Sequence, residues 1–280
     1  MRPAEVIRRG AAYLERHGIE SPDANAERLM MHVLGAGRTG VLARTDPLSA
    51  AEARAYGRVL CLRCTGIPLQ HLTGEQGFRR LVLEVRPGVF VPRPETEVVA
   101  GVALERIASA GTPAVVDLGT GSGAMALAVK DERPDARVWA TDLSPDAVEL
   151  ARANATRLGL DVDVRAGDLF DALPAELRGA IDLVVANPPY VPTERADDLA
   201  PDALADPPLA LFGDLAFAER LLDTALVWLR IGGVVVQEIE EGTGSAMTEL
   251  ARRVGFVEVA VLPDLNGRDR VLVAVRPDGR

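Results

Sequence analysis

The sequence lacks any apolar run long enough to cross a membrane. A transmembrane helix needs about 18 or more consecutive apolar residues, and charged residues interrupt every candidate stretch before that length. The N-terminus, MRPAEVIRRGAAYLERHG, carries charges throughout and has no apolar core of a secretory signal. We therefore expect a cytoplasmic protein that makes no membrane contact.

Cysteine and histidine are scarce, with 2 and 3 residues in 280. Cys61 and Cys64 form a lone CxxC, whose functional interpretations are half of a metal site or a redox pair. No second CxxC follows, and His17, His32 and His71 are not spaced as metal ligands. The favoured interpretation is two small residues on one helix, so we predict no metal site and no disulfide framework.

Basic residues are outnumbered, with 31 Lys and Arg against 41 Asp and Glu, which gives a net charge of −10. An acidic protein repels nucleic-acid phosphates, so we expect no direct nucleic-acid partner. The imbalance is uneven along the chain. Residues 1–85 hold 12 Arg and 9 acidic residues, whereas residues 86–280 hold 19 basic and 32 acidic ones. A mildly basic N-terminal part therefore precedes an acidic body.

The N-terminal part has the apolar spacing of helices. Helices are predicted over residues 3–18, 21–35 and 49–66. Ser21 is expected to cap the second helix, with Pro22 at its first position, and Ser49 with Glu52 has the pattern of a capping box. The sequence therefore predicts a small helical domain over residues 1–75.

A change to period-two alternation follows this helical part. GFRRLVLEV and VFVP, separated by the turn residues RPG, predict a β-hairpin at residues 77–92. We interpret residues 76–93 as a connector between two domains.

From residue 94 onward, strand-like and helix-like runs alternate. Alternation of this kind predicts a doubly wound, mostly parallel sheet with helices on both faces. The last two strands are joined by a link too short for a crossover helix, so they must pair antiparallel. Strands are predicted at residues 113–119, 136–142, 162–168, 181–187, 232–240, 256–263 and 270–277, and helices at 95–109, 123–132, 144–158, 214–230 and 243–254.

A glycine-rich turn follows the first of these strands, in VVDLGTGSGAMAL. Such turns bring backbone close to a ligand at the carboxyl end of a sheet, and dinucleotide sites share this feature. Here the spacing is G-x-G-x-G, and Asp117 precedes the turn, which favours a cationic ligand over a pyrophosphate. The predicted cofactor residues of this turn are Asp117, Gly119, Thr120, Gly121, Ser122 and Gly123.

The next two strands also end in carboxylates. Asp142, followed by Leu143, lies 19 residues after Gly123, where an acidic residue can accept both hydroxyls of a ribose. Asp168 and Leu169 end the third strand and are expected to bind the amine and cover the ring of an adenine. The alternative is that both aspartates only cap loops. Three such residues at successive strand ends favour S-adenosylmethionine.

The fourth strand ends in Asn187, Pro188, Pro189 and Tyr190. The prolines stiffen the chain and hold Asn187 extended. The Asn187 side-chain carbonyl and the Pro188 backbone carbonyl can each accept one N–H of a planar NH2 group, while Tyr190 packs on its face. Such a group is a poor nucleophile, and the two dipoles stabilise the positive charge that it gains during methyl transfer. We therefore predict catalysis by Asn187, Pro188 and Tyr190, with Asn187 also next to the donor.

Long segments of the chain resemble the HemK/PrmC family, most specifically FVPRPETE combined with NPPY. Further similar segments are GIPLQHLTGEQGFRRLVLEVRPGVFVPRPETEVV, DLGTGSGAMALA, DPPLALFG and LNGRDRVL. The resemblance implies an N5-glutamine methyltransferase of peptide chain release factors, which modifies the Gln of a Gly-Gly-Gln loop and leaves S-adenosylhomocysteine. It implies that Phe90, Arg93 and Glu95 shape the glutamine pocket, together with Asn187–Tyr190.

The resemblance also implies that residues 1–75 recognise the release factor and that residues 94–280 form the methyltransferase domain. Two departures concern an aliphatic Leu169, where the family usually has an aromatic residue, and a shortened segment after Gly213. The open alternatives are methylation of another protein glutamine, for example on a ribosomal protein, and N6-methylation of adenine in nucleic acid. A non-catalytic donor-binding module and a nicotinamide-dependent dehydrogenase are weaker alternatives. A monomer is expected.

Overall fold

A computed structural model describes residues 1–198 and 201–279 of the chain, which forms two compact units. The first comprises Met1–Glu75 and Ala200–Ala205, and the second comprises Gln76–Leu199 and Asp206–Arg280. Across the described residues, no helix is both long and apolar enough to cross a membrane.

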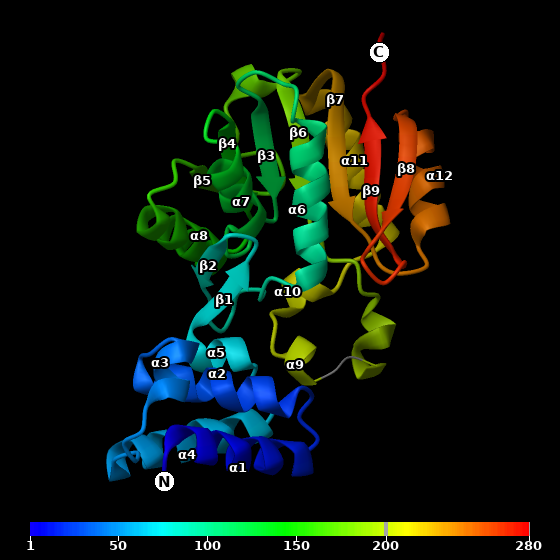
Figure 1. Ribbon diagram of the computed structural model, residues 1–280. Helices are drawn as coiled ribbons and strands as arrows, with labels where there is room; N and C mark the ends of the chain where they lie inside the picture. The colour runs from blue at the N-terminus through cyan, green and yellow to red at the C-terminus, as the bar shows by residue number, and fades with distance from the viewer. Residues whose placement is uncertain (199–200, 280) are drawn as a thin grey trace. The chain divides into compact units, whose positions relative to one another are not determined.

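The first unit is helical, as predicted (Figure 1). Its apolar core includes Leu14, Leu29, Met30 and Tyr56, each almost completely buried. The Tyr56 hydroxyl donates to the backbone carbonyl of Ala26 at 3.0 Å, so the buried phenol is paired. The three predicted helices are present, and three short helices of this unit, α3, α5 and α9, were not predicted from the sequence. The elements are α1 (Pro3–Arg16), α2 (Pro22–Leu34), α3 (Arg38–Ala43), α4 (Ala50–Cys64), α5 (Leu69–Thr73) and α9 (Pro201–Leu204).

The predicted capping box of α4 is confirmed. Glu52 N–H donates to Ser49 Oγ at 3.2 Å, and Ser49 N–H donates to Glu52 Oε2 at 2.7 Å. Ser21 does precede α2, with Pro22 at the first helical position, but its side chain makes no capping bond because its backbone is left-handed, at φ 48°.

The connector contains a β-hairpin whose position differs from the prediction. The strands are β1 (Glu75–Phe78) and β2 (Leu81–Glu84), so the chain reverses at Arg79 rather than at the Pro87–Gly88 turn. Arg79 adopts φ 51°, and its guanidinium pairs with Glu132. The predicted second strand after Gly88 is therefore wrong, because residues 89–92 form no strand.

The second unit contains the predicted seven-stranded sheet, in the order β5-β4-β3-β6-β7-β9-β8. The first five of these strands pair parallel, whereas β9 is antiparallel to both of its neighbours. Figure 1 shows β3 and β7 pointing in one direction and β9 in the other. The strands are β3 (Ala114–Leu118), β4 (Arg137–Asp142), β5 (Asp163–Ala166), β6 (Ile181–Ala186), β7 (Leu229–Glu238), β8 (Val257–Pro263) and β9 (Asp269–Val275).

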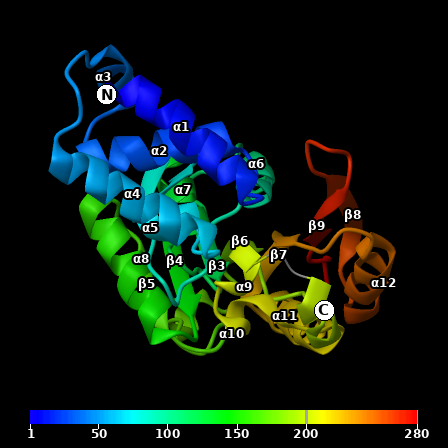
Figure 2. The ribbon, with the colours of Figure 1, turned by 90° about the horizontal axis from the view of Figure 1, so that it is seen from below.

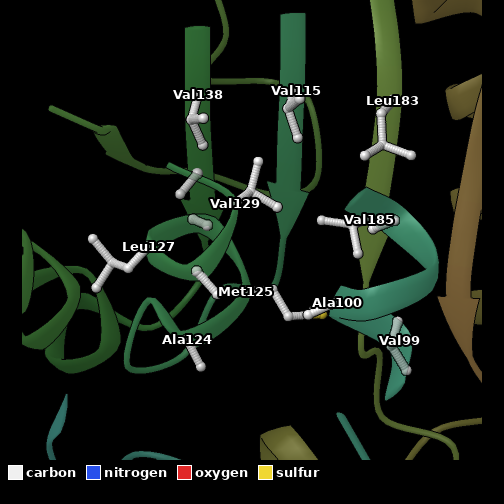
Figure 3. Close-up of a cluster of buried hydrophobic side chains, with 14 of the residues drawn as sticks. Val99, Ala100, Val115, Ala124, Met125, Leu127, Val129, Val138, Leu183 and Val185 are labelled. Carbon is white, nitrogen blue, oxygen red and sulfur yellow. The ribbon is translucent and has the colours of Figure 1, made fainter. Parts of the chain in front are cut away.

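Helices cover both faces of this sheet, as predicted for a doubly wound fold (Figure 2). On one face, side chains of α6 and α7 pack against alternate strand residues such as Val115, Leu183 and Val185 (Figure 3), and α8 adds to the same cluster. On the other, α11 and α12 pack against the residues between them, such as Val116 and Val184. The helices of this unit are α6 (Pro94–Arg106), α7 (Ala124–Glu132), α8 (Pro145–Leu158), η1 (Ala175–Leu177), η2 (Thr193–Asp198), α10 (Pro208–Leu211), α11 (Leu215–Trp228) and α12 (Gly244–Val254).

The central position of β3 determines where the functional loops meet. Leu118 at its end is in register with Thr141 of β4 and Ala186 of β6. The glycine turn after β3 and the Asn-Pro-Pro-Tyr segment after β6 therefore emerge side by side at the carboxyl edge of the sheet.

A single asparagine joins the hairpin to this edge. Asn154 of α8 is completely buried, and its Oδ1 accepts from Glu84 N–H at 2.8 Å. Its Nδ2 donates to the carbonyls of Glu84 and Ser122, both at 3.0 Å. The last residue of β2 and the glycine turn are thus held by one side-chain amide.

Candidate active site

A cavity of about 1270 Å³ opens at the carboxyl edge of the second unit. Its volume exceeds that of most drug-sized ligand pockets and is sufficient for a nucleoside with a neighbouring side chain. The predicted site residues that line it are Phe90, Gly119, Thr120, Gly121, Ser122, Asp142, Leu143, Asp168, Leu169, Asn187, Pro188, Pro189 and Tyr190. No group of His, Cys, Asp and Glu suited to a metal ion is found among the described residues.

The glycine turn needs glycine at three positions. Gly119, Gly121 and Gly123 have φ values of 67°, 56° and 87°, in the left-handed region that other residues adopt at a cost. The N–H groups of Gly119 and Thr120 donate to the carbonyl of Thr141 on the neighbouring strand, at 2.9 and 3.0 Å. These bonds hold the turn against β4 before any ligand is bound. Gly123 itself is the N-cap of α7 and does not line the cavity.

Asp142 organises the same edge from the end of β4. Its Oδ2 accepts from Gly121 N–H at 2.8 Å, and its Oδ1 accepts from Ser144 N–H at 2.9 Å. Burial raises the pKa of Asp142, and these backbone N–H groups oppose the rise. A carboxylate held by two backbone donors still has lone pairs that can accept from hydroxyl groups of a ligand.

Asp117 lies beneath the turn, completely buried and outside the cavity lining. Its Oδ2 accepts from Thr120 Oγ1 at 2.6 Å and from Ala126 N–H at 3.1 Å. Its Oδ1 is buried and has no hydrogen-bond partner within the described part of the chain. Burial raises the pKa of Asp117 to about 7. An unpaired acidic oxygen under a ligand-binding turn suits a cationic group such as an ammonium or sulfonium.

Asp168 has a partner that the sequence did not indicate. Arg220 of α11 pairs with its two carboxylate oxygens at 2.5 and 3.3 Å, and its guanidinium lies over the Phe217 ring at 5.1 Å. Leu169 lines the cavity in a left-handed conformation, at φ 46°. The aromatic Phe170 that follows is buried in the core, stacked on Trp228, and cannot replace Leu169 at the cavity wall.

The Asn-Pro-Pro-Tyr segment is held by two residues that sequence reasoning missed. Asn187 Nδ2 donates to Thr96 Oγ1 at 3.2 Å, and this hydroxyl donates to Glu238 Oε2 at 2.7 Å. The Tyr190 hydroxyl donates to Glu238 Oε1 at 3.2 Å. Because the Asn187 amide uses its NH2 for Thr96, its carbonyl oxygen remains for a ligand in the cavity.

Burial changes the acidity of both end members of this network. It raises the pKa of Glu238 to about 6, against hydrogen bonds from Thr96 and Tyr190 and the positive charge of Arg270. It also raises the pKa of Tyr190, and the Glu238 carboxylate adds to that rise. Tyr190 therefore stays a neutral phenol at physiological pH, while Glu238 is mainly ionised above pH 6.

The residues expected to shape the pocket beside Phe90 occupy different places. Phe90 lines the cavity, whereas Arg93 does not; its guanidinium lies over the Phe90 ring at 5.2 Å and pairs with the buried Asp206. Asp206 also accepts from Val91 N–H at 3.0 Å, which fixes the backbone next to Phe90. Glu95 does not line the cavity, and Thr96, one residue further on, does.

Backbone contacts with the segment after α10 also support the Asn-Pro-Pro-Tyr segment. Val191 forms an isolated parallel bridge with Phe212, and Gly213 N–H donates to the carbonyl of Val191 at 3.1 Å. The segment that follows α10 thus closes one wall of the cavity.

Two family models match the chain. The PrmC N-terminal domain matches residues 5–74, and the methyltransferase small domain matches residues 81–260. Together they cover the helical unit and most of the second unit.

Curated relatives match most or all of the chain. A release factor glutamine methyltransferase of Deinococcus radiodurans is 39% identical and covers 100% of both chains. Proteins of the same description from Moorella thermoacetica and Streptomyces coelicolor are 42% and 44% identical, covering 97% and 92% of this chain and 96% and 92% of their own.

Solved structures share the fold at low identity. A 16S rRNA N2 G1207 methyltransferase of T. thermophilus, in complex with AdoMet and guanosine, has a TM-score of 0.54 at 22% identity, covering 72% of this chain and 49% of that one. A ribosomal protein L11 methylase of Lactobacillus delbrueckii subsp. bulgaricus has a TM-score of 0.50 at 22% identity, covering 69% and 84%. These likenesses show a methyltransferase fold.

Proposed function

The chain belongs to the family of the release factor glutamine methyltransferases, and on that premise we propose how its cavity methylates the side-chain amide of a glutamine. The enzyme transfers a methyl group from S-adenosylmethionine to the amide nitrogen of a release factor glutamine. The bond from sulfur to the methyl carbon breaks, a nitrogen–carbon bond forms, and the amide nitrogen loses one proton. S-adenosylhomocysteine and an N5-methylglutamine remain. The observation that carries the proposal is that Asn187 lines the cavity while its NH2 group is bonded to Thr96, which leaves its carbonyl oxygen for a ligand.

The residues around the glycine turn fit the donor. When bound, S-adenosylmethionine supplies an electrophilic methyl group on a positively charged sulfur. Asp142 accepts from the ribose hydroxyls, and Leu143 and Leu169 cover the adenine. Asp117, buried beneath the turn with an unpaired oxygen, makes the site favourable for a cation. Asp168, aligned by Arg220, is assigned to the adenine amine.

The amide is a weak nucleophile because its nitrogen lone pair is delocalised into the carbonyl. Asn187 Oδ1 and the Pro188 carbonyl each accept one N–H, which directs the face of the nitrogen toward the donor and fixes its distance. Positive charge develops on this nitrogen as the methyl group arrives. In this arrangement both carbonyl dipoles point at the nitrogen before the reaction, so they would stabilise the transition state without reorganisation. Tyr190, a neutral phenol at physiological pH, packs against the flat group.

We assign a separate role to each of three segments of the chain. Residues 1–75 recognise the release factor, residues 76–93 connect the two domains, and residues 94–280 bind the donor and the substrate amide. The surplus of arginine in residues 1–85 supports an N-terminal part with its own partner surface. We propose the Gly-Gly-Gln glutamine as the target and the cytoplasm, where release factors act, as the compartment.

The test is intact-mass analysis of a purified release factor incubated with this protein and S-adenosylmethionine. The expected result is a gain of one methyl group, mapped by fragmentation to the glutamine of the Gly-Gly-Gln loop. Asn187→Ala should lower turnover roughly 100-fold or more while the donor still binds, because it removes a carbonyl aimed at developing charge. No mass gain with wild-type protein that binds the donor would contradict the proposed substrate, and equal loss of turnover and donor binding in Asn187→Ala would contradict the role of that residue.

A further inference from the structure

Glu238 is an acidic side chain with no assigned role at the centre of the amide site. It ends β7, is 1% exposed, and lies among the residues that line the cavity. Each of its carboxylate oxygens accepts from one hydroxyl, Oε2 from Thr96 and Oε1 from Tyr190. Thr96 comes from α6 and Tyr190 from the segment after β6, so one carboxylate joins three elements of the fold.

We propose that Glu238 is a positioning residue for methyl transfer, which sets the direction of the hydrogen bonds among the amide-binding groups and places a negative charge beside them. The proposal rests on the proposed function of the cavity, since it concerns the orientation of a substrate amide. Glu238 acts through Thr96, Asn187 and Tyr190 and is not itself assigned a contact with substrate.

The donor and acceptor roles in this network follow from the number of hydrogens that each group carries. The Thr96 hydroxyl has one hydrogen, which goes to Glu238, so its oxygen must accept from Asn187 Nδ2. That bond turns the Asn187 carbonyl toward the cavity, where it can accept from the substrate NH2. A protonated Glu238 would offer a hydrogen to Thr96 instead. Thr96 could then donate to Asn187, whose NH2 would face the substrate NH2, and two donors would oppose each other.

The negative charge of Glu238 favours methyl transfer, as does the orientation of the Asn187 amide. The substrate nitrogen gains positive charge in the transition state, and a buried carboxylate stabilises such charge more strongly than one in water does. The charged and titratable groups around Glu238 are Arg270 on β9, Glu95 on α6 and Tyr190. Arg270 favours the ionised carboxylate, and burial disfavours it more, so the pKa of Glu238 rises to about 6. Ionised Glu238 therefore dominates at neutral pH and is lost below pH 6.

The experiment measures kcat and KM between pH 5 and pH 8.5 with intact release factor and S-adenosylmethionine, for wild type, Glu238→Gln and Glu241→Gln. In the wild type, kcat should fall as one proton binds near pH 6. In Glu238→Gln, kcat at pH 8 should be roughly 100-fold lower, the fall near pH 6 should be absent, and donor affinity should be unchanged. Glu241→Gln, an exposed neighbour that pairs with Arg268, should behave like wild type.

Two further variants separate orientation from fold. Glu238→Asp keeps the charge and should retain the fall near pH 6 with a partly restored kcat. Thr96→Val keeps the shape of Thr96 but breaks the link to Asn187, so kcat should fall while the pH dependence remains. Thermal unfolding of each variant establishes that it is folded.

The proposal is overturned if folded Glu238→Gln keeps the wild-type kcat, or keeps the fall in kcat near pH 6. A wild-type kcat that does not change around pH 6 also overturns it, even if Glu238→Gln fails to fold. Failure of the proposed function looks different, because the wild type would then not methylate release factor at any pH.

Discussion

Gly213 lies directly against the backbone carbonyl of Pro189. A Cβ atom built on Gly213 would be 2.0 Å from the Pro189 oxygen, far inside van der Waals contact. The φ of Gly213 is not in the left-handed region, so the glycine is required here by space rather than by conformation. The second proline of the Asn-Pro-Pro-Tyr segment is therefore in place only because the neighbouring chain has no side chain.

Gly213→Ala should displace this segment and with it the amide-binding carbonyls. A displacement of about 1 Å can lower a rate about 100-fold, so we expect a loss of that order in kcat with little change in donor affinity. The measurement is steady-state kinetics with release factor, together with calorimetric titration of the donor. Gly111→Ala, at a glycine with no atom within 4 Å, is the matched control and should keep the wild-type kcat. Wild-type kcat in Gly213→Ala would show that the segment adapts.

Donor affinity should depend on the ionisation of Asp117. Burial raises its pKa to about 7, and a cationic ligand binds the ionised carboxylate better than the neutral acid. Affinity for S-adenosylmethionine should therefore rise between pH 6 and pH 8, by at most about tenfold per pH unit. Calorimetric titration at three pH values tests this, with Asp117→Asn expected to bind more weakly and to lose this pH dependence. The same pH dependence in Asp117→Asn would assign it to another group.

Glu238 should cost the protein stability at neutral pH. Its folded-state pKa of about 6 lies above the ordinary value of 4.5, so the unfolded chain ionises first as pH rises. Below pH 4.5 Glu238 is protonated in both states and does not lower the free energy of unfolding. As pH rises through 6, the buried carboxylate lowers that free energy. Glu238→Gln cannot ionise and should be more stable than wild type at pH 8, by up to about 2 kcal/mol, but equal to it near pH 4.5. Chemical denaturation at both pH values checks this, and a less stable variant at pH 8 would contradict it.

Gly10→Ala should loosen the helical unit without changing the chemistry of the cavity. A Cβ on Gly10 would lie 2.3 Å from the Tyr56 hydroxyl, which is bonded to Ala26. Overpacking of this kind costs about 1 to 3 kcal/mol. We expect KM for intact release factor to rise, with donor affinity unchanged. Gly57→Ala, at an open helical position, is the stability control and should not destabilise the unit. An unchanged KM with a destabilised helical unit would argue against a recognition role for residues 1–75.

The fold was predictable because its signals are local. Apolar runs and turn residues indicate each strand of the sheet, and short links indicate which neighbours pair antiparallel. The hairpin was misplaced because its reversal depends on a distant contact. Arg79 is an unusual residue for a left-handed turn, and Glu132, 53 residues away, holds its guanidinium. The Pro87–Gly88 turn exists, but no strand partner follows it.

In the candidate site too, residues with a local sequence signal were predicted and residues that depend on distant partners were not. The glycine turn, Asp142 and the Asn-Pro-Pro-Tyr segment were found because each lies at the end of its own strand. Thr96, Glu238 and Arg220 were missed because their partners are 91, 48 and 52 residues away. One signal for Glu238 was present in the sequence: a carboxylate inside the apolar run VVVQEI is buried and needs donors.

Asn154 sets a limit on how this protein can be recombined with its relatives. Its one amide holds both the end of β2 and the carbonyl of Ser122 in the glycine turn. A chimaera that exchanges the N-terminal helices together with the hairpin separates the hairpin from α8, which anchors it. The recipient protein must then have an asparagine at the same place on α8. The smallest exchangeable module is therefore discontinuous in sequence, because it includes this residue as well as the hairpin.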